Sequence, residues 1–179
     1  MAEPQVITTS RVILITDIHD FSIVMAGMGW EVHELIQEVY ERLGEIAVGH
    51  QGEILKYVGD TIVAIFPAGS EAAVIQCAAE MRAAYSEILL RRHITHESEL
   101  EVGIGSGDVM EGVFGHPSLR MRDVFGEEVN RTAMIMHHRG IAITERVFDA
   151  VRLTHQTSPL PDVTVKWQAA PLKFWEITG

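Results

Sequence analysis

The spacing of apolar residues changes along this chain, and each change marks a predicted element. Residues Arg11–Ile18 form a nearly continuous run rich in β-branched side chains, which is typical of a central strand buried on both faces. From Trp30 to Val48, apolar residues recur every three or four positions, which predicts a helix with one face on the core. The same spacing predicts a second helix from Ser70 to Leu90.

A hairpin is predicted between these two helices. Its strands are Glu53–Val58 and Thr61–Phe66, and Gly59–Asp60 forms the tight turn. Glycine adopts positive φ readily and aspartate hydrogen-bonds to its own backbone, so this dipeptide favours a turn. Lys56 is unusual because it places a charge on a strand that should be at least half buried. The stretch alone fits either an ordinary hairpin with a solvated lysine or part of a binding site.

The second half of the chain predicts shorter elements. The glycine-rich segment Leu100–Phe114 predicts another hairpin, centred on Ser106–Asp108. It is not a phosphate-binding loop, because G-x-G-x-x-G is not matched and no helix follows directly. The remaining predictions are a strand at Met121–Phe125, a helix at Glu127–His138, a strand at Ile141–Ile143, a helix from Thr144 to Val151, and strands at Val163–Lys166 and Leu172–Ile177.

The order of the predicted elements indicates an α+β fold. Strand, helix, strand, turn, strand, helix and strand make the ferredoxin-like split βαβ core (βαββαβ), here with additional C-terminal strands and helices. In a right-handed crossover the first two strands are parallel, and the third returns antiparallel between them. Asp17, at the end of the first strand, and Asp60, in the hairpin turn, are therefore expected at one edge of the sheet. We expect one domain over residues 1–179, with its core at about 12–177.

Charge and cysteine content narrow the classes of partner. The chain has 14 basic and 25 acidic residues, a net charge of −11, which argues against duplex nucleic acid and anionic membrane surfaces as partners, because both require a basic surface. Cys77 is the single cysteine, which excludes an internal disulfide and fits a reducing compartment. No apolar run approaches the roughly 20 residues needed to span a bilayer, and the N-terminus does not read as a secretory signal. We therefore expect a cytoplasmic domain without membrane insertion.

Two carboxylates that converge at a sheet edge have two explanations. They are either turn and cap residues that happen to be neighbours, or ligands of hard divalent cations. Mg²⁺ prefers one or two carboxylates together with substrate phosphates. Two such ions about 3.5–4 Å apart bind the attacking and leaving oxygens of a phosphoryl displacement. Metal ions would also offset the acidic charge of the chain and so allow a polyanionic ligand.

Four segments together resemble the catalytic domain of class III adenylate/guanylate cyclases. The resemblance covers roughly Val12 to Ile177, and each segment alone is a weak signal. The four segments are TDIHDF at Thr16–Phe21, G-x-x-L-K-Y-V-G-D at Gly52–Asp60, VGIGSGDVMEGVFG at Val102–Gly115 and DVFGEEVN at Asp123–Asn130. Their order and spacing carry the resemblance.

The resemblance implies specific roles for residues on both sides of the predicted site. Asp17 and Asp60 match the two metal-binding aspartates, and Ile18 offers a backbone carbonyl, so two Mg²⁺ or Mn²⁺ ions per site are implied. Asn130 matches the asparagine that positions the ribose in the transition state. Lys166 falls near a position where family members place a phosphate-binding lysine.

The resemblance also implies ATP as substrate and a dimer as the active form. Lys56 and Asp123 match the pair that reads the purine. Adenine offers an acceptor at N1 beside a donor amino group, and this pair supplies one donor and one acceptor. Guanine presents the reverse pattern, so the pair favours ATP over GTP. Family members act as head-to-tail dimers, which implies a homodimer or a complementary cyclase-domain partner with sites at the interface.

The chain departs from the family pattern at Met134. Four residues after Asn130 the family places an arginine, where both side chains share one helix face. Neither Arg131, rotated about 100° around the helix, nor His137, about two turns along, is an equivalent substitute. Two functions follow from the resemblance: an adenylate cyclase that forms cyclic AMP and pyrophosphate in signal transduction, weakened by Met134, or a non-catalytic domain that binds nucleotide or dimerises.

Overall fold

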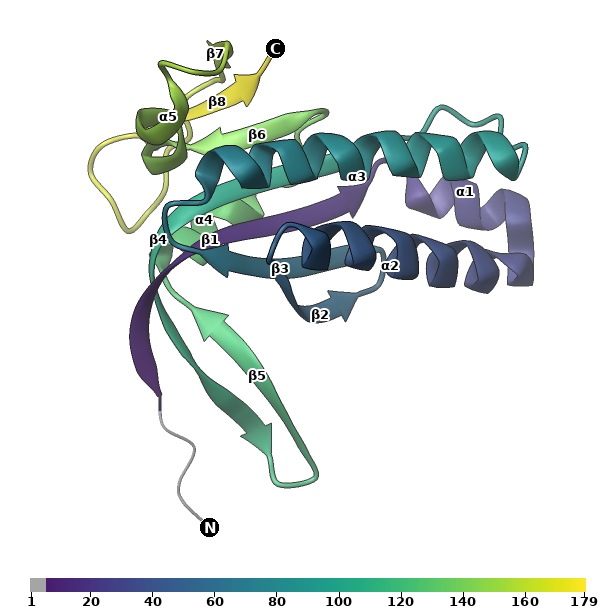
Figure 1. The fold of residues 1–179 in the computed structure, drawn as a ribbon, viewed down its shortest axis with the longest axis horizontal. Coiled ribbons are helices and arrows are strands. Elements are labelled where there is room, and N and C mark those ends of the chain that lie inside the picture. The colour runs from purple at the N-terminus through teal and green to yellow at the C-terminus, as the bar shows by residue number, and fades with distance from the viewer. Residues whose placement is uncertain (1–5) are drawn as a thin grey trace.

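An eight-stranded mixed sheet forms the centre of the fold (Figure 1). The computed structural model describes residues 6–179, so the first five residues of the predicted domain lie outside the described part. The strands are β1 (Ile7–Ile18), β2 (Glu53–Val58), β3 (Thr61–Pro67), β4 (Leu100–His116), β5 (Leu119–Phe125), β6 (Ile141–Thr144), β7 (Thr157–Pro159) and β8 (Phe174–Ile177). The helices are α1 (Phe21–Met28), η1 (a 3₁₀ turn, Gly29–Glu31), α2 (Val32–Gly49), α3 (Glu71–Arg91), α4 (Glu127–Ile135) and α5 (Glu145–Val151).

The split βαβ arrangement is confirmed by the pairing of the strands. The order across the sheet is β2-β3-β1-β4-β6-β8-β7, and β5 pairs with β4 outside this path. β3 lies antiparallel to both β1 and β2, so the first two strands run parallel with the third between them. The turn between β2 and β3 therefore lies at the same edge as the end of β1.

The two faces of the sheet bury different sets of apolar residues. On β1, Val12 and Leu14 belong to the large core under α2 and α3, whereas Ile13 and Ile15 belong to a smaller core on the opposite face. This division follows from the two-residue alternation of side chains along a strand. Figure 1 shows α2 and α3 side by side across one face, with α4 behind the sheet.

The prediction of a hairpin within Leu100–Phe114 is wrong. These residues lie in β4, one continuous strand of 17 residues, and the chain turns only after His116 to form β5. The glycines of β4 allow close packing instead of a turn. A Cβ at Gly103 would lie 2.7 Å from the backbone oxygen of Thr132, and one at Gly105 would lie 2.0 Å from the Thr132 hydroxyl. Helix α4 therefore rests directly on the strand.

Several smaller predictions also differ from the structure. Val163–Lys166 is not a strand: Val163 makes only an isolated bridge to Leu172. The last strand, β8, begins at Phe174, two residues later than predicted, and β7 and α1 were not predicted. Helix α4 ends at Ile135, so the last three residues of the predicted helix lie in the following loop.

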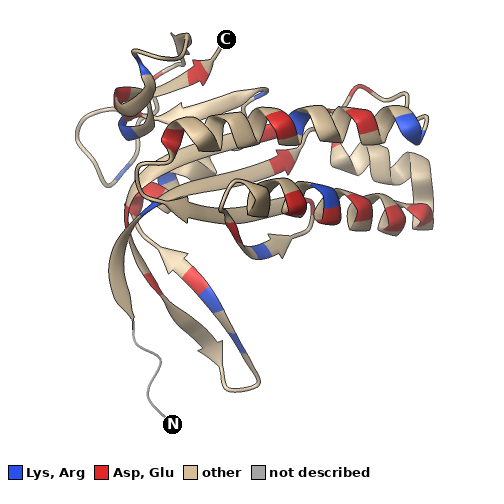
Figure 2. Cartoon of the chain, in the orientation of Figure 1, with Lys and Arg blue, Asp and Glu red and all other residues tan. Residues whose placement is uncertain are grey.

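The hairpin of β4 and β5 projects away from the rest of the sheet as a long arm (Figure 1). Several large apolar side chains on it are exposed: Met110, Val113, Leu119, Met121 and Phe125. Figure 2 shows acidic positions repeated along α2 and α3, with basic positions scattered among them rather than gathered into a patch. Within the described residues, no helix combines the length and hydropathy that a membrane crossing requires.

We predict that Gly103→Ala destabilises the protein. The new methyl group would meet the backbone at Thr132 in α4 and at Met136 just after it, and backbone atoms cannot move aside as a flexible side chain can. Overpacking of this kind costs about 1–3 kcal/mol. Urea unfolding should show this loss. Gly27→Ala in α1 is the matched control, because no atom lies within 4 Å of its new methyl group; it should stabilise the protein by about 0.5–1 kcal/mol. Equal stability of the two variants would contradict the close packing of α4.

Candidate active site

The end of β1 and the turn between β2 and β3 bring Asp17 and Asp60 to one edge of the sheet. The backbone N–H of Ile18 donates a hydrogen bond to Oδ2 of Asp60 at 3.1 Å. The hydroxyl of Thr61 donates to Oδ1 of Asp17 at 2.9 Å. Each aspartate is thus held by a group next to the other one, so the two carboxylates are fixed as neighbours. This is the juxtaposition that the strand order predicts.

Aromatic residues hold the hairpin turn against α2. The rings of Tyr40 on α2 and Tyr57 on β2 stack with centroids 4.0 Å apart. The Tyr40 hydroxyl also donates a hydrogen bond to the backbone oxygen of Gly59, which has φ of +61°. Glycine accommodates this left-handed conformation without steric cost. The turn that presents Asp60 is therefore anchored to α2 by two contacts of Tyr40.

The acidic edge is the sheet edge that carries Asp17, Asp60 and Glu101, and its carboxylates lie close enough to interact. Burial raises the pKa of Asp60, and the nearby charge of Asp17 raises it further, while backbone N–H donors act in the opposite direction. Burial also raises the pKa of Glu101, again with a contribution from Asp17 and with His19 opposing it. Carboxylates that are forced together without a cation repel each other. The oxygen donors of Asp17 and Asp60 fit a hard divalent cation, which would relieve this repulsion.

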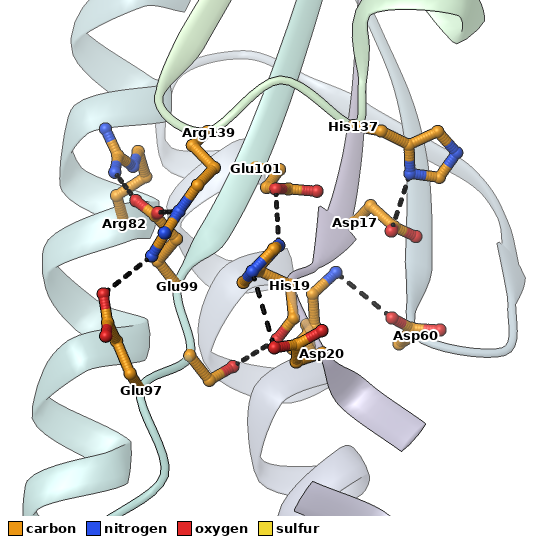
Figure 3. A network of polar contacts seen from close by, with 12 residues as sticks. Asp17, His19, Asp20, Asp60, Arg82, Glu97, Glu99, Glu101, His137 and Arg139 are labelled. Atoms are coloured by element: carbon orange, nitrogen blue, oxygen red, sulfur yellow. Dashed lines mark hydrogen bonds and ion pairs between the residues drawn. The ribbon is translucent and has the colours of Figure 1, made fainter. Parts of the chain in front are cut away.

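Two further residues of this edge were missed as site residues by the reasoning from sequence. Glu101 lies opposite Asp17 in the pairing of β1 with β4, and its Oε1 is 2.9 Å from Nδ1 of His19. Nδ1 of His137 lies 3.0 Å from Oδ2 of Asp17 (Figure 3). An acidic residue inside an apolar strand was the available signal for Glu101. His137 had been considered only as a substitute for an arginine; the structure places it on Asp17 of its own chain.

A second group of predicted residues lines an apolar cavity of about 260 Å³. Lys56 on β2 and Asp123 on β5 form an ion pair there, with Nζ 2.6 Å from Oδ2. The other oxygen of Asp123 accepts a hydrogen bond from the N–H of Val124 at 2.8 Å. The rest of the lining comes from Ile15, Val58, Thr61, Val63, Val124, Val129, Ala133 and Met136. A larger, open hollow of about 550 Å³ beside α1 is lined by none of the predicted site residues.

Three residues singled out in the sequence lie outside both groups. Asn130 and Met134 are exposed on α4, and 37% of Met134 is accessible to solvent. Lys166 is exposed in the irregular segment between β7 and β8. Within residues 6–179, no hydrogen bond or ion pair joins the side chains of Asn130 or Lys166 to the acidic edge or to the Lys56–Asp123 pair. One chain therefore does not assemble all of the predicted residues.

Solved structures share this fold at low sequence identity. The adenylyl cyclase CyaB from P. aeruginosa superposes with a TM-score of 0.90 at 19% identity, covering 98% of this chain and 96% of that one. The guanylyl cyclase Cya2 gives 0.86 at 21% identity, covering 96% and 93%. The guanylate cyclase domain of RhGC from Catenaria anguillulae, solved in complex with GTP, gives 0.76 at 17% identity, covering 99% and 98%. Both adenylyl and guanylyl cyclases are thus structural neighbours of this chain.

The comparison of sequences identifies the family. The search of curated proteins gave no match. The sequence model described as "Adenylate and Guanylate cyclase catalytic domain" matches residues 7–176, which is nearly the whole chain. The fold, the matched residues and the structural neighbours agree, and the chain belongs to the family of adenylate and guanylate cyclase catalytic domains.

Proposed function

We propose that this chain is an adenylate cyclase that converts ATP to cyclic AMP and pyrophosphate. The observation that carries the proposal is the Lys56–Asp123 ion pair on an apolar cavity of about 260 Å³. A purine ring needs an apolar slot with a few polar groups that fix its orientation. In this proposal residues 1–179 form one catalytic domain, with its core at about 12–177.

The chemistry of the pair favours adenine as the base. Lysine has only donors and ionised aspartate only acceptors. Lys56 would donate to N1 of adenine, and Asp123 would accept from its amino group. Guanine carries a donor at N1 and an acceptor at O6, so each protein group would meet a group of its own kind. Guanylyl cyclases among the structural neighbours make this distinction necessary.

The acidic edge would hold the divalent ions that cyclases of this family use. Asp17, Asp60 and the carbonyl of Ile18 would bind two Mg²⁺ or Mn²⁺ ions. When bound, such ions offset the negative charge on the transferring phosphate and its leaving group. Within the chain, Thr61 orients Asp17 through its 2.9 Å hydrogen bond, and the Ile18 N–H orients Asp60. These contacts fix the oxygens before the nucleotide arrives.

A second subunit would complete each site. Asn130 is exposed on α4, and the β4–β5 arm exposes several apolar side chains, so a partner has a surface to bind. In a head-to-tail dimer, Asn130 and the Lys56–Asp123 pair of one subunit would act with Asp17 and Asp60 of the other, and Lys166 would contact phosphate. A homodimer then has two equivalent sites, whereas a complementary cyclase partner would supply missing groups. ATP as substrate and one buried thiol favour the cytoplasm.

One observation favours a second function. Met134 is exposed on α4 one turn after Asn130, where the family pattern has an arginine, and a thioether cannot stabilise developing phosphate charge. The alternative is therefore a non-catalytic domain that binds ATP or dimerises as a regulatory module. Turnover separates the two functions, because only the cyclase predicts that ATP is converted to cyclic AMP.

We predict that the purified chain forms cyclic AMP from ATP in the presence of Mn²⁺ or Mg²⁺. Asp17→Asn should abolish this activity, because an amide cannot replace the charge of a metal ligand, while circular dichroism should show an intact fold. The matched control is Asp20→Asn, which changes a neighbouring carboxylate and tolerates the left-handed backbone at that position. Binding of ATP without any cyclic AMP would establish the non-catalytic alternative. Product that persists in Asp17→Asn would contradict the metal assignment.

We predict that Met134→Arg increases the turnover number. A guanidinium on this face of α4 would stabilise charge in the transition state, and loss of a comparable group costs about 10²–10³-fold in kcat. A gain of that order is expected in an initial-rate assay, with KM for ATP changed little. Met134→Leu is the control, because it keeps the volume without adding a charge. An arginine variant no faster than Met134→Leu would show that this position does not face the reacting phosphate.

We predict that Lys56→Glu combined with Asp123→Ser shifts nucleotide preference from ATP towards GTP. The carboxylate at position 56 would accept from N1 of guanine, and the hydroxyl at position 123 would donate to O6. A matched pair of base contacts discriminates by about 1–3 kcal/mol, or roughly 5- to 150-fold. The ratio of Kd values for ATP and GTP measures this shift without requiring turnover. An unchanged ratio would show that Lys56 and Asp123 do not contact the base.

A further inference from the structure

Three side chains from separate elements meet at the acidic edge, and each presents an atom of a kind that binds metal ions. Asp17 ends β1, Glu101 begins β4, and His137 lies in the loop after α4. One ligand atom from each lies within 4.8 Å of the other two (Figure 3). Nδ1 of His137 and Oδ2 of Asp17 are 3.0 Å apart. Two ligand atoms that bind one Zn²⁺ ion at about 2.0–2.2 Å lie about this far apart when they occupy neighbouring coordination positions.

Burial of Glu101 distinguishes this group from a chance cluster of surface acids. Its side chain is only 4% exposed. Oε1 forms the 2.9 Å hydrogen bond with His19, whereas no hydrogen bond among residues 6–179 reaches Oε2, which lies on the Asp17 side in Figure 3. A carboxylate charge in so buried a side chain is costly unless positive charge lies beside it. A cation shared with Asp17 and His137 would supply that charge on the side away from His19.

The surroundings hold these side chains in place. Nδ1 of His19 forms a hydrogen bond with Oε1 of Glu101. In metal sites, neighbouring residues commonly orient the ligating side chains through such hydrogen bonds. The loop that carries His137 is fixed two residues later, where Arg139 forms ion pairs with Glu99 and, at 2.9 Å, with Glu97. The cluster is therefore built from anchored elements, although His137 itself remains accessible to an incoming ion, with 62% of its side chain exposed.

We propose that Asp17, Glu101 and His137 of one subunit bind a single divalent transition-metal ion. Two carboxylates and an imidazole favour Zn²⁺ or Co²⁺, whereas Mg²⁺ and Mn²⁺ prefer oxygen ligands. Glu101 and His137 lie outside the Asp17–Asp60 pair, so this site goes beyond the proposed cyclase. An ion in it would occupy Asp17 and inhibit turnover. Only that consequence rests on the proposed function, because binding requires neither nucleotide nor dimer.

The test is a calorimetric titration of the metal-free chain with Zn²⁺ in the absence of nucleotide. We expect one strong site per chain that millimolar Mg²⁺ does not displace, and a Co²⁺-loaded form with a visible absorption band. His137→Gln and Glu101→Gln should each weaken Zn²⁺ binding by more than about 10-fold, the smallest loss typical even for supporting residues. His138→Gln is the matched control, because His138 faces Glu176 at 3.6 Å instead of Asp17; it should bind Zn²⁺ like the wild type.

Two patterns among the variants would overturn the proposal, as would the absence of Zn²⁺ binding by the wild-type chain. One is equal Zn²⁺ affinity in His137→Gln and His138→Gln. The other is a loss in Asp60→Asn as large as that in His137→Gln with none in Glu101→Gln, which would place the ion on the Asp17–Asp60 pair. If Glu101→Gln does not fold, His137→Gln still decides, because its exposed side chain is not part of the core. Failure of Zn²⁺ binding with cyclic AMP formation intact would remove this site and leave the proposed function standing.

Discussion

The direct contact between α4 and β4 is the constraint on which both groups of site residues depend. At Gly103 and Gly105 the strand has no side chain to hold the helix away, so α4 rests on its backbone. Val129 and Ala133 of α4, with Met136 just after the helix, then form part of the wall of the cavity beside Lys56 and Asp123. The loop after the same helix brings His137 to the acidic edge. One close packing contact thus sets the positions of groups at two separate places.

Local patterns in the sequence were sufficient to predict the strands β1 to β3 and the helices α2 and α3, although α1 was missed. The helix and strand periods are strong there, and the handedness of the crossover leaves one arrangement of the three strands. Asp17 and Asp60 could therefore be brought together before any coordinates were known. Lys56 and Asp123 were paired only through the family resemblance, because they lie 67 positions apart on strands that the predicted order did not place together.

The main error in the second half, the predicted hairpin within β4, has a physical cause. Glycines in β4 were interpreted as turn residues, but their lack of a side chain serves contact with α4. No local pattern distinguishes these two uses of glycine, because the difference depends on a helix more than 20 residues away. Glu101 and His137 were missed as site residues for a similar reason: nothing in their own segments shows that the fold places them beside Asp17.

The Lys56–Asp123 ion pair has a consequence for selectivity. Without a nucleotide the two groups bond to each other at 2.6 Å, so neither waits unsatisfied. In the proposed function, an entering base would exchange this internal bond for two new ones, and its net gain would be the difference between them. A base with the wrong pattern of donors and acceptors would not complete the exchange, and the ion pair would form again. The ion pair would thus compete with every base for the same two protein groups.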